Sequence, residues 1–139
     1  MNFAFIMRGI PGSGKSTVAK KLAGETGAIH SNDSYYYENG EYRFDKARVP
    51  EVRLQNLKAF TESIQAGIPV VICDSCNLTS EQWGPYTKIA SEAGYIVSFV
   101  TMPQPDIEIS VSRNIHSVPE ESIRDMIERW EDLPPKLNL

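Results

Sequence analysis

The sequence predicts a small three-layer α/β domain in which helices cover a parallel sheet of four to five strands. Short apolar runs alternate along the chain with longer amphipathic segments, the pattern of repeated βαβ units. The 139 residues suffice for a hydrophobic core without disulfides or a structural metal. Hydrophobic residues make up 41% and charged residues 23%, a balance typical of folded chains. We therefore expect residues 1–139 to form a single domain.

Four apolar runs are the expected strands. Residues 3–7 are almost entirely apolar and predict a strand that is buried on both faces. Residues 69–73 form the next clearest run, and residues 95–101 form another. Residues 28–30 predict a weaker strand, which comes second along the chain. Numbered along the chain, these strands are expected to lie in the order 2-3-1-4.

Five amphipathic segments are the expected helices. Pro50 opens the second helix and Gly67 lies near its end. The third helix follows a capping box in which Thr79 is the cap and Gln82 stands three residues on, and Gly94 ends it. Residues 31–47 are polar and contain an Asn-Gly turn signal, and residues 133–139 are expected to be irregular. The expected helices cover about residues 15–23, 50–66, 80–93, 105–114 and 119–130.

Residues 9–16 match the phosphate-loop pattern G-x-x-x-x-G-K-[ST] at every fixed position, between the first strand and the first helix. Gly12 and Gly14 allow the backbone to bend so that successive N–H groups point at phosphate oxygens. Lys15 neutralises the β- and γ-phosphates, and the Ser16 hydroxyl is a hard oxygen ligand for Mg²⁺. ATP and Mg²⁺ are therefore the expected ligands, in a kinase-type phosphate-loop nucleoside triphosphate hydrolase fold. The predicted nucleotide-binding residues are Gly12, Ser13, Gly14, Lys15, Ser16 and Thr17.

Three further residues occupy positions that a small kinase requires. Asp33 follows the second strand, where a carboxylate takes the proton of an acceptor hydroxyl, although a turn-capping role explains it equally well. Asp74 ends the third strand, where an acid organises Mg²⁺ together with Ser16. Arg113 lies in the expected lid at about residues 113–119, where a cation stabilises the transferring phosphoryl group, but a solvated surface arginine is the alternative. No Asn-Lys-x-Asp segment is present, which excludes a switch GTPase.

Several segments together make the chain resemble the polynucleotide 5′-hydroxyl kinase branch of the phosphate-loop kinases, which includes the kinase domain of phage polynucleotide kinase. It also resembles zeta-toxin and AAA-type small ATP-binding kinases, and most closely the kinase-like domains of a eukaryotic ubiquitin-ligase-binding protein group. The resemblance implies that Asp33 is the general base, that Lys15 and Ser16 bind phosphate and magnesium, and that Arg113 is the lid arginine. The matching segments are residues 8–17, 31–35, 40–45, 71–78, 83–86 and 113–119.

The sequence departs from this family on the acceptor side. Residues 35–37 are three tyrosines where the phage enzyme has a basic residue that grips nucleic acid. Arg53 aligns with a histidine of the eukaryotic domains, and Ser34 stands where they usually have a second aspartate. These tyrosines, with Tyr42 and Phe44, either stack on exposed bases or pack the loop onto the domain.

Three functions remain open at this point. The first is transfer of the γ-phosphate of ATP to a polynucleotide 5′-hydroxyl. The second is transfer to a small hydroxyl compound such as a nucleoside, sugar nucleotide or antibiotic, and the third is a nucleotide-binding module that acts through a partner without catalysis. The net charge of −4 excludes a protein that holds nucleic acid by bulk positive charge.

The sequence does not predict a membrane span, a signal peptide or a redox site. No apolar run approaches the ~18 residues that a membrane span requires. The first residues do not form a signal peptide, so we expect a cytoplasmic protein. Cys73 and Cys76 form a C-x-x-C segment, but one lies in a buried strand and the other in the loop beyond it, so we do not expect a redox pair. Residues 119–132 carry six acids and two arginines, and we do not expect them to touch phosphate.

Overall fold

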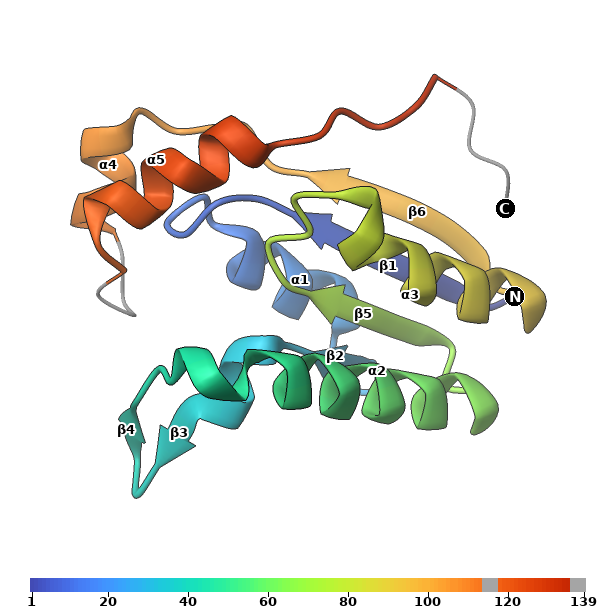
Figure 1. Ribbon diagram of the computed structural model, residues 1–139. Coiled ribbons are helices and arrows are strands. Elements are labelled where there is room, and N and C mark those ends of the chain that lie inside the picture. The colour runs from blue at the N-terminus through green and yellow to red at the C-terminus, as the bar shows by residue number, and fades with distance from the viewer. Residues whose placement is uncertain (114–117, 136–139) are drawn as a thin grey trace.

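A parallel sheet forms the centre of the computed structural model, which describes residues 1–113 and 118–135. Its four strands are β1 (Phe3–Arg8), β2 (Ala28–His30), β5 (Val70–Asp74) and β6 (Ile96–Thr101), in the order β2-β5-β1-β6 (Figure 1). This is the predicted order 2-3-1-4, because β3 and β4 belong to a separate two-stranded hairpin. The predicted three-layer phosphate-loop fold is confirmed.

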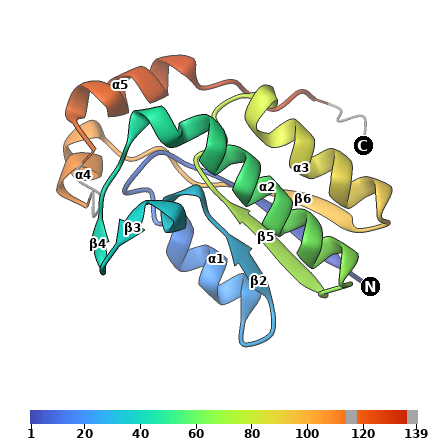
Figure 2. The ribbon, with the colours of Figure 1, turned by 60° about the horizontal axis from the view of Figure 1, so that its bottom comes forward.

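Three helices cover the two faces of the sheet. Helix α1 (Lys15–Ala23) packs on one face, where Ala19 and Ala23 contact a cluster with Met7 and Ile72. Helices α2 (Val49–Gln65) and α3 (Ser80–Glu92) pack on the other face, where a larger aromatic core surrounds Phe60 (Figure 2). Because β1 and β5 contribute to both clusters, their side chains are buried on both sides, as their apolar runs predict.

The last two helices are shorter than expected and lie beyond the carboxyl ends of the strands (Figure 1). They are α4 (Ile107–Ser112) and α5 (Glu120–Arg129), and residues 114–117 of the expected lid fall outside the described part of the chain. The described residues after α5 have no regular structure, as predicted for the tail. Among the described helices, none is both long and apolar enough to cross a membrane.

The expected capping box at the start of α3 is only half formed. Thr79 is the N-cap residue of the helix, as predicted, but its side chain makes no capping hydrogen bond. The Gln82 side chain does reach back, but its Oε1 accepts from the backbone N–H of Leu78, 2.7 Å away, one residue before the expected partner. This bond fixes the chain at the end of the loop that follows β5.

The polar segment after β2 is more ordered than expected. It contains two 3-10 helices, η1 (Asn32–Tyr36) and η2 (Lys46–Arg48), and a hairpin of β3 (Tyr37–Glu38) and β4 (Glu41–Tyr42). Asn39 and Gly40 turn the hairpin with φ of 53° and 81°, the left-handed conformation that a tight two-residue turn requires. The hairpin lies at the carboxyl end of the sheet, across from α4 and α5 (Figure 1).

Candidate functional site

The phosphate loop joins β1 to α1 and is held from outside by α4. Gly12 and Gly14 adopt φ of 82° and 88°, a conformation that side chains disfavour. A Cβ atom on Gly12 would lie 2.8 Å from the Ser110 carbonyl oxygen, so no other residue fits there without a shift. The fully buried Ser110 also donates its hydroxyl hydrogen bond to the Pro11 carbonyl. Ser110 is a positioning residue that no sequence motif indicated.

A serine, an aspartate and a lysine meet at the base of the loop. The Ser16 hydroxyl donates to Asp74 Oδ2 at 2.9 Å, and Asp74 is buried at the end of β5. Burial raises the pKa of the Asp74 carboxyl, although Lys15 and the Ser16 hydrogen bond oppose that rise. Burial lowers the pKa of the Lys15 ammonium, but the nearby carboxylates of Asp74 and Asp33 help to raise it above its ordinary value. Lys15 is therefore a cation at neutral pH.

The oxygen atoms at this point fit a magnesium ion. Asp74 Oδ1 is buried and has no hydrogen-bond partner, while its other oxygen accepts from Ser16. A hydroxyl and one carboxylate suit Mg²⁺, which usually takes one or two protein ligands and completes its shell with phosphate oxygens and water. The part of the chain that the structure describes has no cluster of three or more metal-ligating side chains, so a closed protein cage is absent there.

Asp33 lies in the first turn of η1 and faces the same pocket as Lys15 and Ser16. The Tyr42 hydroxyl donates to Asp33 Oδ1 at 3.1 Å and so orients the carboxylate. Burial and the nearby Asp33 charge raise the pKa of the Tyr42 phenol, so Tyr42 remains a donor at neutral pH. The hairpin therefore contributes a positioning residue, Tyr42, that the sequence showed only as one of several aromatics.

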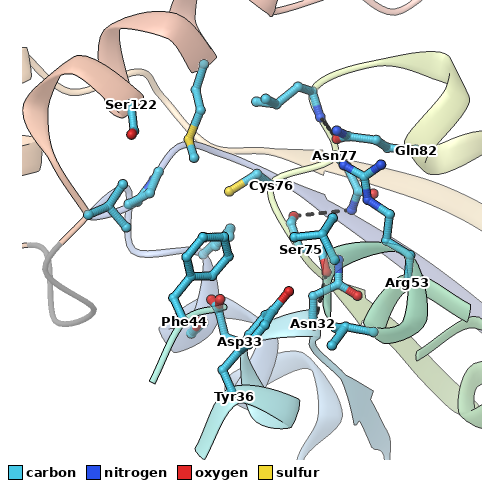
Figure 3. Close-up of a pocket in the computed structure, with 18 of the residues that line it drawn as sticks. Asn32, Asp33, Tyr36, Phe44, Arg53, Ser75, Cys76, Asn77, Gln82 and Ser122 are labelled. Atoms are coloured by element: carbon cyan, nitrogen blue, oxygen red, sulfur yellow. Dashed lines mark hydrogen bonds between the residues drawn. The ribbon is translucent and has the colours of Figure 1, made fainter. Parts of the chain in front are cut away.

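These residues line one large pocket of about 1410 Å³ at the carboxyl ends of the strands. Figure 3 shows Asp33 and Phe44 on one side of it and Cys76 and Asn77 in the loop beyond β5. Arg113 also lines the pocket, and its Cβ would be 3.3 Å from a Cβ on Gly12. The structure thus brings the predicted site residues to one region, except that Ser13 of the phosphate loop does not line the pocket and has a buried hydroxyl without a hydrogen-bond partner. Those that line the pocket are Gly12, Gly14, Lys15, Ser16, Thr17, Asp33 and Arg113, while Asp74 lies buried beside Ser16.

Helix α5 forms another wall of the pocket, which the acidic composition of residues 119–132 did not indicate. Ser122, Asp125, Met126 and Arg129 all line it. Arg129 Nε lies 2.9 Å from Asp125 Oδ2, so the negative charge of Asp125 is balanced by Arg129 on this wall. The wall is therefore compatible with an anionic ligand in the pocket.

Arg8 is a second residue that sequence analysis did not single out. It ends β1 and is 1% exposed, with its guanidinium 4.4 Å from the Trp83 ring centroid and 4.2 Å from that of Trp130. It donates to the carbonyls of Asn77 at 2.8 Å and Leu78 at 3.1 Å, and to that of Glu131. Arg8 therefore ties the strand that feeds the phosphate loop to the loop after β5 and to the chain after α5. The feature of the sequence that could have indicated this role is an arginine directly at the end of an apolar strand.

Asn77 completes this junction. It adopts φ of 50°, is buried, and donates from Nδ2 to the Met7 carbonyl at 2.7 Å. In addition, the Gly9 N–H donates to the Cys76 carbonyl at 3.2 Å. The ends of β1 and β5 are thereby fixed to each other, which sets the position of Asp74 relative to the phosphate loop.

The two cysteines of the C-x-x-C segment are not bonded to each other. Both are free thiols, Cys73 in the buried strand and Cys76 in the loop beyond it, as predicted. Burial raises the pKa of Cys73 to about 12. Burial also raises the pKa of Cys76, although Lys15 opposes that rise. Both sulfur atoms are therefore protonated at neutral pH, which disfavours thiolate chemistry.

Known proteins resemble this chain in both sequence and fold. Human NEDD4-binding protein 2 is 34% identical over 134 residues, a match that covers 91% of this chain and 7% of that protein. This chain therefore spans a small part of the length of that relative.

Two solved structures share the fold at lower identity. One is the Pnkp1/Rnl/Hen1 RNA repair complex, with a TM-score of 0.68, 17% identity and coverage of 92% of this chain and 43% of the matched chain. The other is a sugar kinase from Janibacter sp., with a TM-score of 0.68, 22% identity and coverage of 97% and 81%. Similarity at this level concerns the fold, and it places the chain among kinase-type phosphate-loop folds.

The chain also matches a family profile along most of its length. The match covers residues 5–133, which include the phosphate loop, Asp33, Asp74 and the described parts of the pocket wall from α5. The family is described as an AAA domain. With a match of this extent, the chain belongs to the AAA domain family.

Proposed function

We propose that this chain is an ATP- and Mg²⁺-dependent phosphotransferase whose acceptor is a polynucleotide 5′-hydroxyl. The observation that carries the proposal is the pairing of Ser16 with Asp74 beside Lys15, with one Asp74 oxygen left without a hydrogen-bond partner. This is the arrangement that a metal-bound triphosphate requires. Asp33 faces the same pocket, where an acceptor hydroxyl has room to enter.

Each residue has a separate task in the proposed reaction. The phosphate-loop N–H groups and Lys15 hold the ATP phosphates, and Ser16 and Asp74 hold Mg²⁺, which neutralises phosphate charge when bound. Asp33 accepts the proton of the acceptor hydroxyl, whose oxygen forms a bond to the γ-phosphorus. The bond from that phosphorus to the bridging oxygen breaks, and ADP leaves. Arg113 stabilises charge on the transferring phosphoryl group.

The acceptor is proposed from the resemblance of residues 71–78 and 113–119 to polynucleotide kinases and from the fold shared with a chain of an RNA repair complex. A small hydroxyl compound is the second candidate. It is favoured by the acidic composition, with pI ≈ 5.2, and by an equal TM-score to a sugar kinase.

An acceptor panel tests the proposal. The wild-type chain is incubated with γ-labelled ATP, Mg²⁺ and either a 5′-hydroxyl oligonucleotide, a nucleoside, a sugar or no acceptor. We expect label on the oligonucleotide and little release of phosphate without an acceptor. Label on the sugar alone would support the second candidate. ATP binding without label on any acceptor would support a non-catalytic nucleotide-binding module.

Asp74→Asn is expected to raise the Mg²⁺ concentration for half-maximal transfer by ~10–100-fold, because an amide replaces the charged oxygen ligand. Titration of initial rates with Mg²⁺ measures this change. Glu92→Gln, at the exposed end of α3, removes a carboxylate far from Ser16 and is the matched control. Equal Mg²⁺ dependence in wild type and Asp74→Asn would contradict the assignment of Asp74.

A further inference from the structure

The chain that leaves α5 is fastened to the end of β1. We call residues 130–133 the strap, a segment without regular structure that passes the start of α3 (Figure 1). The Trp130 ring centroid lies 4.2 Å from the guanidinium carbon of Arg8. The Glu131 carbonyl accepts from the Arg8 side chain, and the Glu131 N–H donates to the Leu78 carbonyl at 2.9 Å. The strap therefore contacts the residue that directly precedes the phosphate loop.

The strap also completes the N-terminus of α3. Thr79 is the N-cap of this helix, but its side chain makes no capping hydrogen bond. The Glu131 carboxylate takes that role, because its Oε2 accepts from the backbone N–H of Ser80 at 3.3 Å. A carboxylate at this end of a helix interacts favourably with the exposed N–H groups and the helix dipole. Leu133 packs against the core cluster to which α3 contributes, so the strap is seated on α3 as well as on Arg8.

Helices α4 and α5 have few attachments to the rest of the domain. Among the elements that the structure describes, each of the two packs extensively only against the other. Helix α4 is tied to the phosphate loop where the Ser110 hydroxyl donates to the Pro11 carbonyl. Helix α5 is tied to Arg8 through the strap that follows it. Both attachment points lie at the phosphate loop or next to it, so they set the position of the two helices relative to the loop.

The contact between Arg8 and Trp130 is the side of this junction that is able to open. The guanidinium lies between two rings, those of Trp83 and Trp130. Trp83 is 3% exposed and belongs to the core, whereas Trp130 is half-buried and follows a helix that packs mainly on α4. A cation–π contact is stronger where water is excluded, so closure of the Trp130 ring on Arg8 is favourable.

The same two parts of the molecule face each other across the pocket. Lys15 and Ser16 line it from the phosphate loop and α1, and Met126 and Arg129 line it from α5. A nucleotide held by the phosphate loop therefore has α5 as another wall of its pocket. A ligand that binds better when this wall is in place also favours the closed strap, because linkage between two equilibria is reciprocal.

We propose that Arg8 and the strap form a latch, which when closed holds α5 against the pocket and so raises the affinity for nucleotide. Neither Arg8 nor Trp130 lines the pocket, so both are positioning residues that act through the phosphate loop and α5. The inference rests on the part of the proposed function that assigns nucleotide binding to this pocket, and it is independent of the acceptor. It makes nucleotide affinity depend on a contact that the nucleotide does not touch.

Nucleotide binding by latch variants tests the inference. Trp130→Leu removes the ring but keeps an apolar side chain, and Trp130→Phe keeps a smaller ring. The matched control is Phe3→Leu, which removes a half-buried aromatic side chain at the opposite end of β1, outside the pocket. The dissociation constant and the dissociation rate of ADP are measured with Mg²⁺ present, and thermal unfolding shows whether each variant is folded.

Trp130→Leu is expected to raise the Kd for ADP by about 3–10-fold through faster dissociation, because affinity falls with the fraction of closed latch. The loss of a desolvated cation–π contact shifts closure by at most about 30-fold, which limits the effect. Trp130→Phe should fall between Trp130→Leu and wild type, since a phenyl ring attracts a guanidinium less strongly than indole does. Phe3→Leu should bind ADP as wild type does.

A second variant opens the latch without changing an aromatic ring. Glu131→Ala removes the carboxylate from the Ser80 N–H and is expected to raise the Kd for ADP by about 2–5-fold. Loss of an acid near a site for an anion would by charge alone tighten binding, so weaker binding points to the latch. Glu128→Ala removes an exposed acid of α5 that does not line the pocket, and it should bind ADP at least as tightly as wild type.

Tryptophan fluorescence reports latch closure directly. The chain has two tryptophans, and both flank Arg8. Trp83→Phe leaves Trp130 as the emitting side chain, and the quencher acrylamide measures how accessible it is. We expect ADP with Mg²⁺ to lower the quenching constant of Trp130, and addition of Glu131→Ala to raise it.

These results separate the latch from the proposed function. If Trp130→Leu and Glu131→Ala are folded and bind ADP as their controls do, or if ADP leaves the quenching of Trp130 unchanged, the latch is overturned while transfer by wild type still stands. If Trp130→Leu is unfolded, Glu131→Ala decides. If both variants weaken ADP binding as expected but wild type phosphorylates no acceptor, the latch stands and the proposed kinase function fails. If wild type does not bind ADP or ATP, both are overturned.

Discussion

We expect Lys15→Met to lower the rate of phosphoryl transfer by roughly 10²–10³-fold, because it removes a preorganised cation that neutralises the transferring phosphate. Lys15 is charged at neutral pH, since the carboxylates of Asp74 and Asp33 raise its pKa against the effect of burial. Methionine keeps the length and the apolar part of the side chain but cannot neutralise phosphate charge. We expect the dissociation constant for ATP to rise as well. Initial rates and equilibrium ATP binding measure the two effects separately.

The matched control for this substitution is Lys21→Met in the last turn of the same helix. Lys21 is exposed and does not line the pocket, so this variant should transfer phosphate at the wild-type rate. Thermal unfolding of both variants shows whether either change disturbs the fold. Transfer by Lys15→Met within about twofold of wild type would be incompatible with a phosphate-binding role, given the ~1.5–3 kcal/mol of a hydrogen bond to a charged group.

Arg8→Met is expected to lower the free energy of unfolding by about 3–5 kcal/mol, because each buried carbonyl left without a donor costs ~1–3 kcal/mol. The guanidinium lies between Trp83 and Trp130 and donates to three backbone carbonyls, which a methionine leaves without these donors. A domain of this size is stable by only ~5–15 kcal/mol, so the expected loss is about a fifth or more of its stability. Urea denaturation with the midpoint and slope fitted together measures the loss.

Two further variants define the cause of that loss. Arg8→Lys keeps the charge but lacks the planar fork that reaches several carbonyls, so it should also be strongly destabilised. Arg124→Met removes an exposed arginine of α5 that pairs with Glu120 at 3.6 Å, and it should change stability by less than ~1 kcal/mol. An Arg8→Met protein as stable as Arg124→Met would show that Arg8 does not hold the junction.

Much of the architecture was predictable because local patterns and the global fold agree. The apolar runs of β1 and β5 are buried on both faces, as continuous apolar strands between helices are in parallel sheets. The phosphate-loop pattern fixed the connection between β1 and α1. Thr79 is the N-cap as predicted, but the hydrogen bonds of the capping box differ, because the pattern does not specify which backbone N–H the Gln82 side chain reaches.

The site was predictable where a motif carries its own geometry. Lys15 and Ser16 follow from the phosphate loop. Asp33 follows from its place just after β2, and Asp74 from its place at the end of β5, both at one edge of the sheet. Ser110 and Arg8 were not predictable in this way. Each of them acts through tertiary contacts with residues more than 60 positions away, for which a single sequence gives no periodicity or spacing.

The most direct test of the central claim compares wild type with Asp33→Asn for transfer of labelled γ-phosphate from ATP to a 5′-hydroxyl oligonucleotide. Asparagine preserves the size of Asp33 and a side-chain oxygen near the Tyr42 hydroxyl, but it cannot take a proton. We predict label on the oligonucleotide with wild type, a loss of ~10²–10⁴-fold with Asp33→Asn, and equal ATP affinity for both proteins. Bound ATP with no transfer by wild type, or equal transfer by both proteins, would contradict it.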